Sequence, residues 1–169
     1  IRPDATGSIS LGALQDNGSY TTATASGLGW KGTQGGDGWD VAYDGTIAGQ
    51  VYCTSGFWSP APCTRVWRST NEGLTFPTEI TPWGTTSDAG CYLSPIATDP
   101  STGGIVYVSG SQNLWQSFNS GSTWRIISTF ARAGHVSVSG TTGNCVVFAA
   151  GSQVFVSTGS YGTLAGTIG

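Results

Sequence analysis

The chain has 169 residues, a net charge of −3, 27 glycines and only 9% charged residues. So few lysines and arginines argue against nucleic acid or an anionic membrane as a partner, because neither would meet a basic patch. No apolar run approaches the roughly 20 residues that a membrane-spanning helix needs. Ile1–Asp4 do not begin a secretion signal, so we expect any such signal to lie outside this sequence.

The cysteines Cys53, Cys63, Cys91 and Cys145 are even in number and lack the C-x-x-C spacing of zinc or redox sites. Disulfide bonds in an exported protein are therefore favoured, which predicts an extracellular, cell-surface or periplasmic location. The sequence indicates no cofactor and no metal site. It contains no phosphate loop, and His135 has no second ligand at metal spacing, so we expect a structural role for it.

In chain order, the first predicted element is a hairpin of residues 8–14 and 19–24. The sequence Gln-Asp-Asn-Gly joins the two strands at residues 15–18, and Asn-Gly is a strong signal for a tight turn. Asn17 also begins an N-glycosylation sequon, although the turn alone explains these residue types.

The next segment, Gly-Gly-Asp-Gly at residues 35–38, precedes a predicted strand. Such a glycine-rich approach lets the backbone come close to a ligand while Asp37 supplies a hydrogen-bond acceptor. The alternative is a loop that caps itself through an Asx-turn.

Strand-like segments then recur in units. The predicted strands are 39–44, 51–55 and 66–70 in the first unit, 95–99, 104–109 and 113–118 in the second, and 146–150 and 154–158 in the third. Repetition of this kind is typical of propeller blades.

The first unit carries an insertion at residues 56–65, where the other units use three or four residues. A hairpin there could bring Cys53 and Cys63 to the roughly 5.5 Å between Cα atoms that a disulfide needs, so we predict that bond. Phe57 and Trp58 would then be rigid aromatic rings for a carbohydrate or protein ligand, unless they fold back over the neighbouring blade. The pairing of the two remaining cysteines is left open, because it must cross between blades.

A polar motif, S-x-N-x-G-x-T-aromatic, follows a strand at residues 69–76 and again 48 residues later, at 117–124. A decayed copy follows at 157–164. In the two complete copies the asparagine can bond its own backbone, the glycine can take a positive φ and the threonine hydroxyl can close a turn. The final Phe76 or Trp124 can pack beneath that turn.

This motif resembles the Asp-box, S-x-D-x-G-x-T-W, of sialidases, sortilin-type receptors and xyloglucan-hydrolysing propellers, with Asn71 and Asn119 in place of aspartate. The sequences at 15–18 and 35–38 are also similar to segments next to inner strands of sortilin-like propellers. The resemblance implies a propeller with its boxes on the blade rim and Asp37 near the axial channel.

The predicted fold is therefore all-β, with about three to three and a half four-stranded antiparallel blades. Residues 1–30 would end a preceding blade, 31–83 and 84–130 would be blades, and 131–169 a partial blade. Because propellers close with roughly four to eight blades, we expect this segment to pack against the rest of a larger propeller or against identical subunits.

The tryptophans divide by position. Those on repeating strand positions are expected in the core: Trp67, Trp115 and Trp124. Those in loops or at strand starts are candidates for a sugar-facing surface: Trp30, Trp39, Trp58 and Trp83.

Two classes of function fit these features. One is a non-catalytic exported module that binds glycan or extracellular protein, or forms a structural part of an extracellular assembly. The alternative is part of a xyloglucanase-like glycoside hydrolase, which needs paired carboxylates about 6.5 to 9.5 Å apart if it inverts.

The catalytic candidates are Asp16 and Asp37, with Asp88 as a third. Other acidic residues fit catalysis less well because they end strands or lie in a box: Asp44, Asp99 and Glu72. In enzymes of the resembling family the two acids come from separate propeller domains, so the binding or structural function is favoured.

Overall fold

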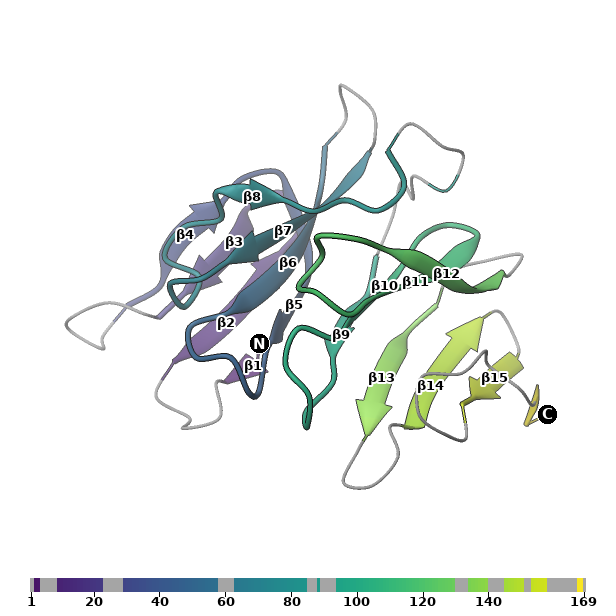
Figure 1. Ribbon diagram of the computed structural model, residues 1–169. Coiled ribbons are helices and arrows are strands. Elements are labelled where there is room, and N and C mark those ends of the chain that lie inside the picture. Colours follow the sequence, from purple (N-terminus) through teal and green to yellow (C-terminus); the bar gives the residue numbers. More distant parts are fainter. Residues whose placement is uncertain are drawn as a thin grey trace.

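The computed structural model describes residues 2–3, 9–22, 29–57, 63–84, 88, 94–129, 134–139, 145–150, 153–157 and 167–168. Within this part of the chain every regular element is a β-strand, and sixteen strands form four antiparallel sheets of four. Figure 1 shows the sheets following one another in chain order. No helix among the described residues is long and apolar enough to cross a membrane.

Each sheet consists of four consecutive strands. The first contains β1 (Arg2–Pro3), β2 (Ser10–Leu14), β3 (Gly18–Thr21) and β4 (Lys31–Gln34). The second contains β5 (Asp37–Tyr43), β6 (Val51–Gly56), β7 (Thr64–Ser69) and β8 (Thr78–Glu79). The third contains β9 (Ile96–Thr98), β10 (Val106–Ser109), β11 (Asn113–Ser117) and β12 (Arg125–Thr129). The fourth contains β13 (Val136–Ser139), β14 (Cys145–Ala150), β15 (Gln153–Val156) and β16 (Thr167–Ile168).

The predicted all-β fold of four-stranded antiparallel blades is confirmed. The strands differ from the predicted units at two points. Residues 31–34 were assigned to a new blade, yet β4 pairs with β3 and completes the first sheet. Residues 131–169 were expected to form a partial blade, yet the four described strands in this range form one sheet. Both differences involve outer strands that are short, and β4 is also polar, so they carry little sequence signal.

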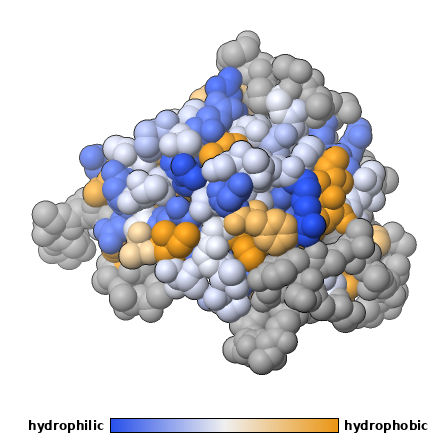
Figure 2. Space-filling model, in the orientation of Figure 1, coloured by the Kyte–Doolittle hydropathy of each residue, from blue (hydrophilic) through white to orange (hydrophobic). Residues whose placement is uncertain are grey.

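The core lies between successive sheets. All six residues of β6 and all four of β10 are buried, as expected for strands covered on both faces. Three apolar clusters fill the boundaries and are represented by Leu11 with Val51, Tyr52 with Val106, and Tyr107 with Val136. On the face shown in Figure 2, the hydrophobic residues form several separate patches among hydrophilic ones. Apolar packing between successive sheets therefore stabilises the fold.

The tryptophans follow the predicted division only in part. Trp67, Trp115 and Trp124 pack against the core clusters as expected, although each remains partly exposed. Trp83 was a candidate for a sugar-facing surface, and that prediction is wrong. It is 1% exposed, and its Nε1–H donates to the carbonyl of Thr64 at 3.0 Å. The chain after β8 directs the Trp83 ring into the core. Burial of this large apolar ring is favourable even though the residue lies in a loop.

The predicted disulfide between Cys53 and Cys63 is wrong, because both residues are thiols. Cys53 pairs with Trp67 across β6 and β7, whereas the Cys63 carbonyl accepts the N–H of Phe57. The two cysteines therefore lie four residue steps apart along the hairpin, about 13 Å, which exceeds the reach of a disulfide. Burial raises the pKa of the Cys53 thiol to about 12.

Each sheet has two ends, which carry different turns and connections. We call the end with the start of β5 and the β6–β7 connection the loop end. The opposite end, which carries the β5–β6 connection and the motif turns after β7 and β11, is the turn end. The first strands β5, β9 and β13 lie next to one another, so residues at matching ends of successive sheets come close together.

The two motif turns have the same hydrogen bonds. Ser69 Oγ accepts the N–H groups of Asn71 and Gly73 at 3.1 and 3.0 Å, and Asn71 Oδ1 accepts the N–H of Thr75 at 3.0 Å. The equivalent distances in residues 117–124 are 3.2, 2.8 and 2.8 Å. The glycine takes a positive φ in both copies, and so does the residue before it. The asparagine side chain therefore closes both turns in the same way.

Candidate ligand-binding site

Asp16 and Asp37 meet at the loop end. The turn between β2 and β3 holds Asp16 at a φ of 62°, and its N–H donates to Asp37 Oδ1 at 2.7 Å. Asp16 is exposed and Asp37, the first residue of β5, is half-buried. Among the described residues Asp37 Oδ2 accepts no hydrogen bond. The two sequence segments that suggested a site therefore form one site, which we call the Asp37 site.

Glycines allow the backbones to come this close. A Cβ at Gly38 would lie 2.2 Å from the carbonyl oxygen of Gly18, and a Cβ at Gly18 would lie 1.9 Å from that of Gln34. Gly18 also has a φ of 80°. These approaches exclude side chains at both positions. The glycines thus place the Asp16 turn directly against the start of β5.

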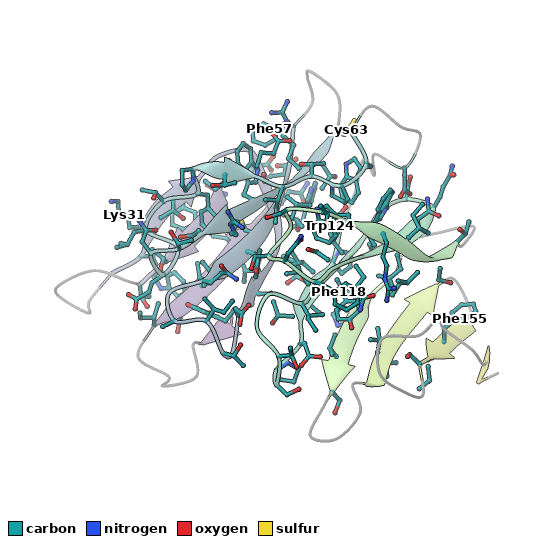
Figure 3. The ribbon with its side chains drawn as sticks, viewed as in Figure 1. Lys31, Phe57, Cys63, Phe118, Trp124 and Phe155 are labelled. Atoms are coloured by element: carbon teal, nitrogen blue, oxygen red, sulfur yellow. The ribbon has the colours of Figure 1, made fainter. Side chains whose placement is uncertain are left out.

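Aromatic residues flank Asp37. A Cβ at Gly36 would lie 3.0 Å from the Phe57 ring, and a Cβ at Gly56 would lie 2.7 Å from the Trp39 ring. Gly56 is the strand partner of Asp37. The structure therefore brings two predicted binding aromatics, Phe57 and Trp39, against the backbone of residues that neighbour or pair with Asp37. Figure 3 shows Phe57 at the β6–β7 hairpin.

No local pattern in the sequence indicated that Arg65 belongs to this site. Its guanidinium carbon lies 5.4 Å from the centre of the Phe57 ring, and its Nη1 lies 3.4 Å from Glu79 Oε2. The cation holds Phe57 from one side. Only the hairpin register, which places residue 65 near residue 57, produces this contact.

Of the other predicted binding residues, Trp30 is described, and it lies apart from this group. Trp30 is 48% exposed and directly precedes β4. The last residue of β4 lies near the Asp16 turn, so Trp30 is at the far end of that strand. In Figure 3 the following residue, Lys31, lies far from Phe57. Trp58, Cys91 and the Cys145 side chain lie outside the described residues. Asn17 is exposed in the turn, where its Nδ2 donates to the Gln15 carbonyl at 3.0 Å.

Asp88 was the third carboxylate candidate, and its contacts leave it little freedom. It is 3% exposed and its Oδ1 accepts the N–H groups of Gln112 and Asn113 at 2.5 and 3.0 Å. Its Oδ2 accepts the indole N–H of Trp115. The carboxylate therefore fastens the β10–β11 connection.

Asp44 and Asp99 perform a similar task at the turn end. Asp44 Oδ1 accepts the N–H groups of Thr46 and Ile47 at 3.1 and 2.9 Å, and Asp99 Oδ1 accepts those of Ser101 and Thr102 at 2.8 and 2.9 Å. A repeated D-x-S/T pattern, 55 residues apart, is the signal for these loops. Among the described residues no group of three or more His, Cys, Asp or Glu side chains could hold a metal ion.

Known structures share this fold. A GH74 enzyme from Niastella koreensis is 20% identical with a TM-score of 0.73, covering 98% of this chain and 28% of that protein. The GH74 xyloglucanase from Xanthomonas campestris is 18% identical with a TM-score of 0.65, covering 94% and 28%. An ancestral GH74 enzyme is 15% identical with a TM-score of 0.59, covering 99% and 26%.

These likenesses define the class of fold. The chain has the fold of part of a β-propeller enzyme and spans little more than a quarter of the length of these proteins. At such low identity the likeness concerns the fold alone. No protein-family model and no curated protein matches the sequence.

Proposed function

We propose that the chain is a propeller segment of an exported carbohydrate-binding protein and that the Asp37 site contacts the glycan. One observation carries this proposal: Asp37 is held by the N–H of Asp16, while its second oxygen accepts no hydrogen bond among the described residues. A fixed carboxylate with an open acceptor suits the hydroxyl groups of a sugar. The adjacent Phe57 offers an apolar surface on which a sugar ring can pack.

The proposed relation to Asp-box and sortilin-like propellers rests on the two motif turns and their shared hydrogen bonds. The proposed export rests on the low content of charged residues. The disulfide that had also favoured export is absent between Cys53 and Cys63. A glycan on Asn17 would stand next to Asp37, so modification there would compete with ligand binding.

Binding can be measured by titrating the protein with soluble xyloglucan and cello-oligosaccharides in a calorimeter. Asp37→Asn keeps the shape of the side chain but weakens hydrogen bonding to hydroxyl groups, so we expect affinity to fall about tenfold. Glu72→Gln is the matched control, because it changes an exposed carboxyl at the turn end. Equal affinity in both variants would refute the role of Asp37.

The second candidate is a glycoside hydrolase, favoured by the structural likeness to GH74 enzymes. In that case Asp37 would be one of two carboxylates, and the other would come from outside this segment. Release of reducing ends from xyloglucan tests the idea. Asp37→Asn should then lower the rate about 100-fold or more, while Glu72→Gln leaves it unchanged.

We further propose that the first and fourth sheets pack against additional blades, from the rest of a longer protein or from identical subunits. Apolar clusters fill the boundaries between the described sheets, and the two outermost faces need similar cover. Centrifugation provides the test. A soluble, well-folded monomer of this 17.3 kDa chain at micromolar concentration would contradict the proposal.

A further inference from the structure

The two motif turns differ in what surrounds their closing aromatic residue. In the first copy Phe76 is 6% exposed and lies in the core between the first and second sheets. In the second copy Trp124 is only partly buried and lines a cleft of about 380 Å³. The first copy thus buries its aromatic residue, whereas the second leaves it partly exposed beside a cleft.

The sequence explains this difference. The position two residues before the aromatic is Leu74 in the first copy and Ser122 in the second. The opposite wall of the cleft contains Gly84, while the neighbouring Trp83 turns into the core. Small residues therefore stand where larger side chains would fill the space.

The Trp124 ring is fixed in position. Its Nε1–H donates to the carbonyl of Ile80 at 2.8 Å, which ties the third sheet to the outer part of the second. A rigid indole loses little conformational entropy when a ligand packs on it. The cleft volume also falls within the range of about 300 to 1,000 Å³ that is typical of small-molecule sites.

The polar groups favour a neutral ligand. Glu79 is the charged residue among the described lining residues, and Arg65 pairs with it at 3.4 Å. Thr81 Oγ1 donates to Glu79 Oε1 at 2.8 Å, which adds a hydroxyl at the same rim. Among the described residues of the cleft, an anion would meet the paired Arg65 and no other cation of the lining, and a cation would compete with Arg65 for Glu79. The carboxylate oxygens of Glu79 can instead accept further hydrogen bonds from the hydroxyl groups of a ligand.

We propose that this cleft is a second binding site that takes one neutral saccharide unit, with the apolar face of the sugar on Trp124. It is lined by Glu79, Ile80, Thr81, Gly121, Ser122 and Trp124, and we call it the Trp124 cleft. Figure 3 shows Trp124 apart from Phe57, and the cleft adjoins the Asp37 site through Arg65, which contacts Phe57 and pairs with Glu79. The ligand class agrees with the proposed function, but the inference rests on the cleft alone.

The test follows the indole N–H resonance of Trp124 by NMR while cellohexaose is added. Trp124→Phe assigns the resonance. All titrations use an Asp37→Asn background, so that loss of binding at the Asp37 site cannot be mistaken for loss at the cleft. Ser122→Arg places a long side chain over the cleft from an exposed position. Gln112→Arg is the matched control, because it adds the same group at an exposed position elsewhere on the third sheet.

We expect the Trp124 resonance to shift saturably in the background protein and in the Gln112→Arg control. Ser122→Arg should weaken this response about tenfold or more. A Trp124 resonance that does not move, or equal binding by the two arginine variants, would overturn the inference. Neither result depends on whether Asp37 binds glycan, so the two proposals can fail separately.

Discussion

Asp37 at the loop end and Asp44 at the turn end are the same residue type in opposite situations. At the turn end Asp44 is 7% exposed and accepts bonds from Thr46, Ile47, Gln50 and, in the next sheet, Gly104. At the loop end Asp37 is half-buried and accepts one. A carboxylate that accepts several hydrogen bonds therefore stabilises the fold, whereas one that accepts a single hydrogen bond can still bind a ligand.

The largest expected difference between the ends is in stability. Asp44→Ala removes the acceptor for two N–H groups of its own loop and for the N–H of Gly104, so we expect a loss of about 3 to 5 kcal/mol in the free energy of unfolding. Asp37→Ala should cost less than about 1 kcal/mol. Urea unfolding of the two variants measures both values, and similar losses would remove the distinction between the ends.

A smaller effect is expected at alkaline pH from Tyr52, next to the turn end. Burial raises its pKa from 10.0 to about 12, and Gln50 Nε2 donates to its hydroxyl at 2.6 Å. The unfolded chain therefore loses this proton before the folded chain does. The free energy of unfolding should fall between pH 10 and pH 12, by roughly 3 kcal/mol at most.

Tyr52→Phe is the control for this pH dependence, because it removes the ionisable hydroxyl and leaves Tyr107 of the third sheet in place. Unfolding at pH 8 and at pH 11.5 should differ less in the variant than in the parent chain. An identical difference in both proteins would show that Tyr52 does not titrate in this range.

The smallest predicted effect concerns the motif turns. Ser117→Ala removes the acceptor for the N–H groups of Asn119 and Gly121, so we expect a loss of about 1 to 2 kcal/mol. Ser122→Ala, in the same turn but exposed, should change stability by less than about 0.5 kcal/mol. Thermal unfolding compares them, and equal melting temperatures would show that the serine bonds are not needed.

Local features of the sequence predicted most of the blades. Strand-like segments that recur in units predicted β6 and β10, and both strands are buried along their whole length. The repeated motif gave both turns, since the bonds of Ser69 and Asn71 stay within eight residues. The outer strand β4 was assigned to the wrong sheet, because its polar residues show no alternation of apolar and polar side chains.

The site was predicted as two separate segments. Asp16 and Asp37 were both candidates, yet their contact depends on packing between the first and second sheets, across 21 residues of chain. Trp83 showed the opposite outcome, because its loop position suggested exposure while tertiary packing buried it. The prediction of a Cys53–Cys63 disulfide was wrong because of the strand register, which depends on how far the β6–β7 hairpin extends.

The sequence by itself determined the strands, the turns and their repetition, because these depend on residues close along the chain. Tertiary structure decided which carboxylates accept several hydrogen bonds, which aromatic rings are buried and where a cleft remains. Those outcomes arise where one sheet meets the next, and contacts such as Gly104 with Asp44 or Trp124 with Ile80 join residues that no local pattern connects.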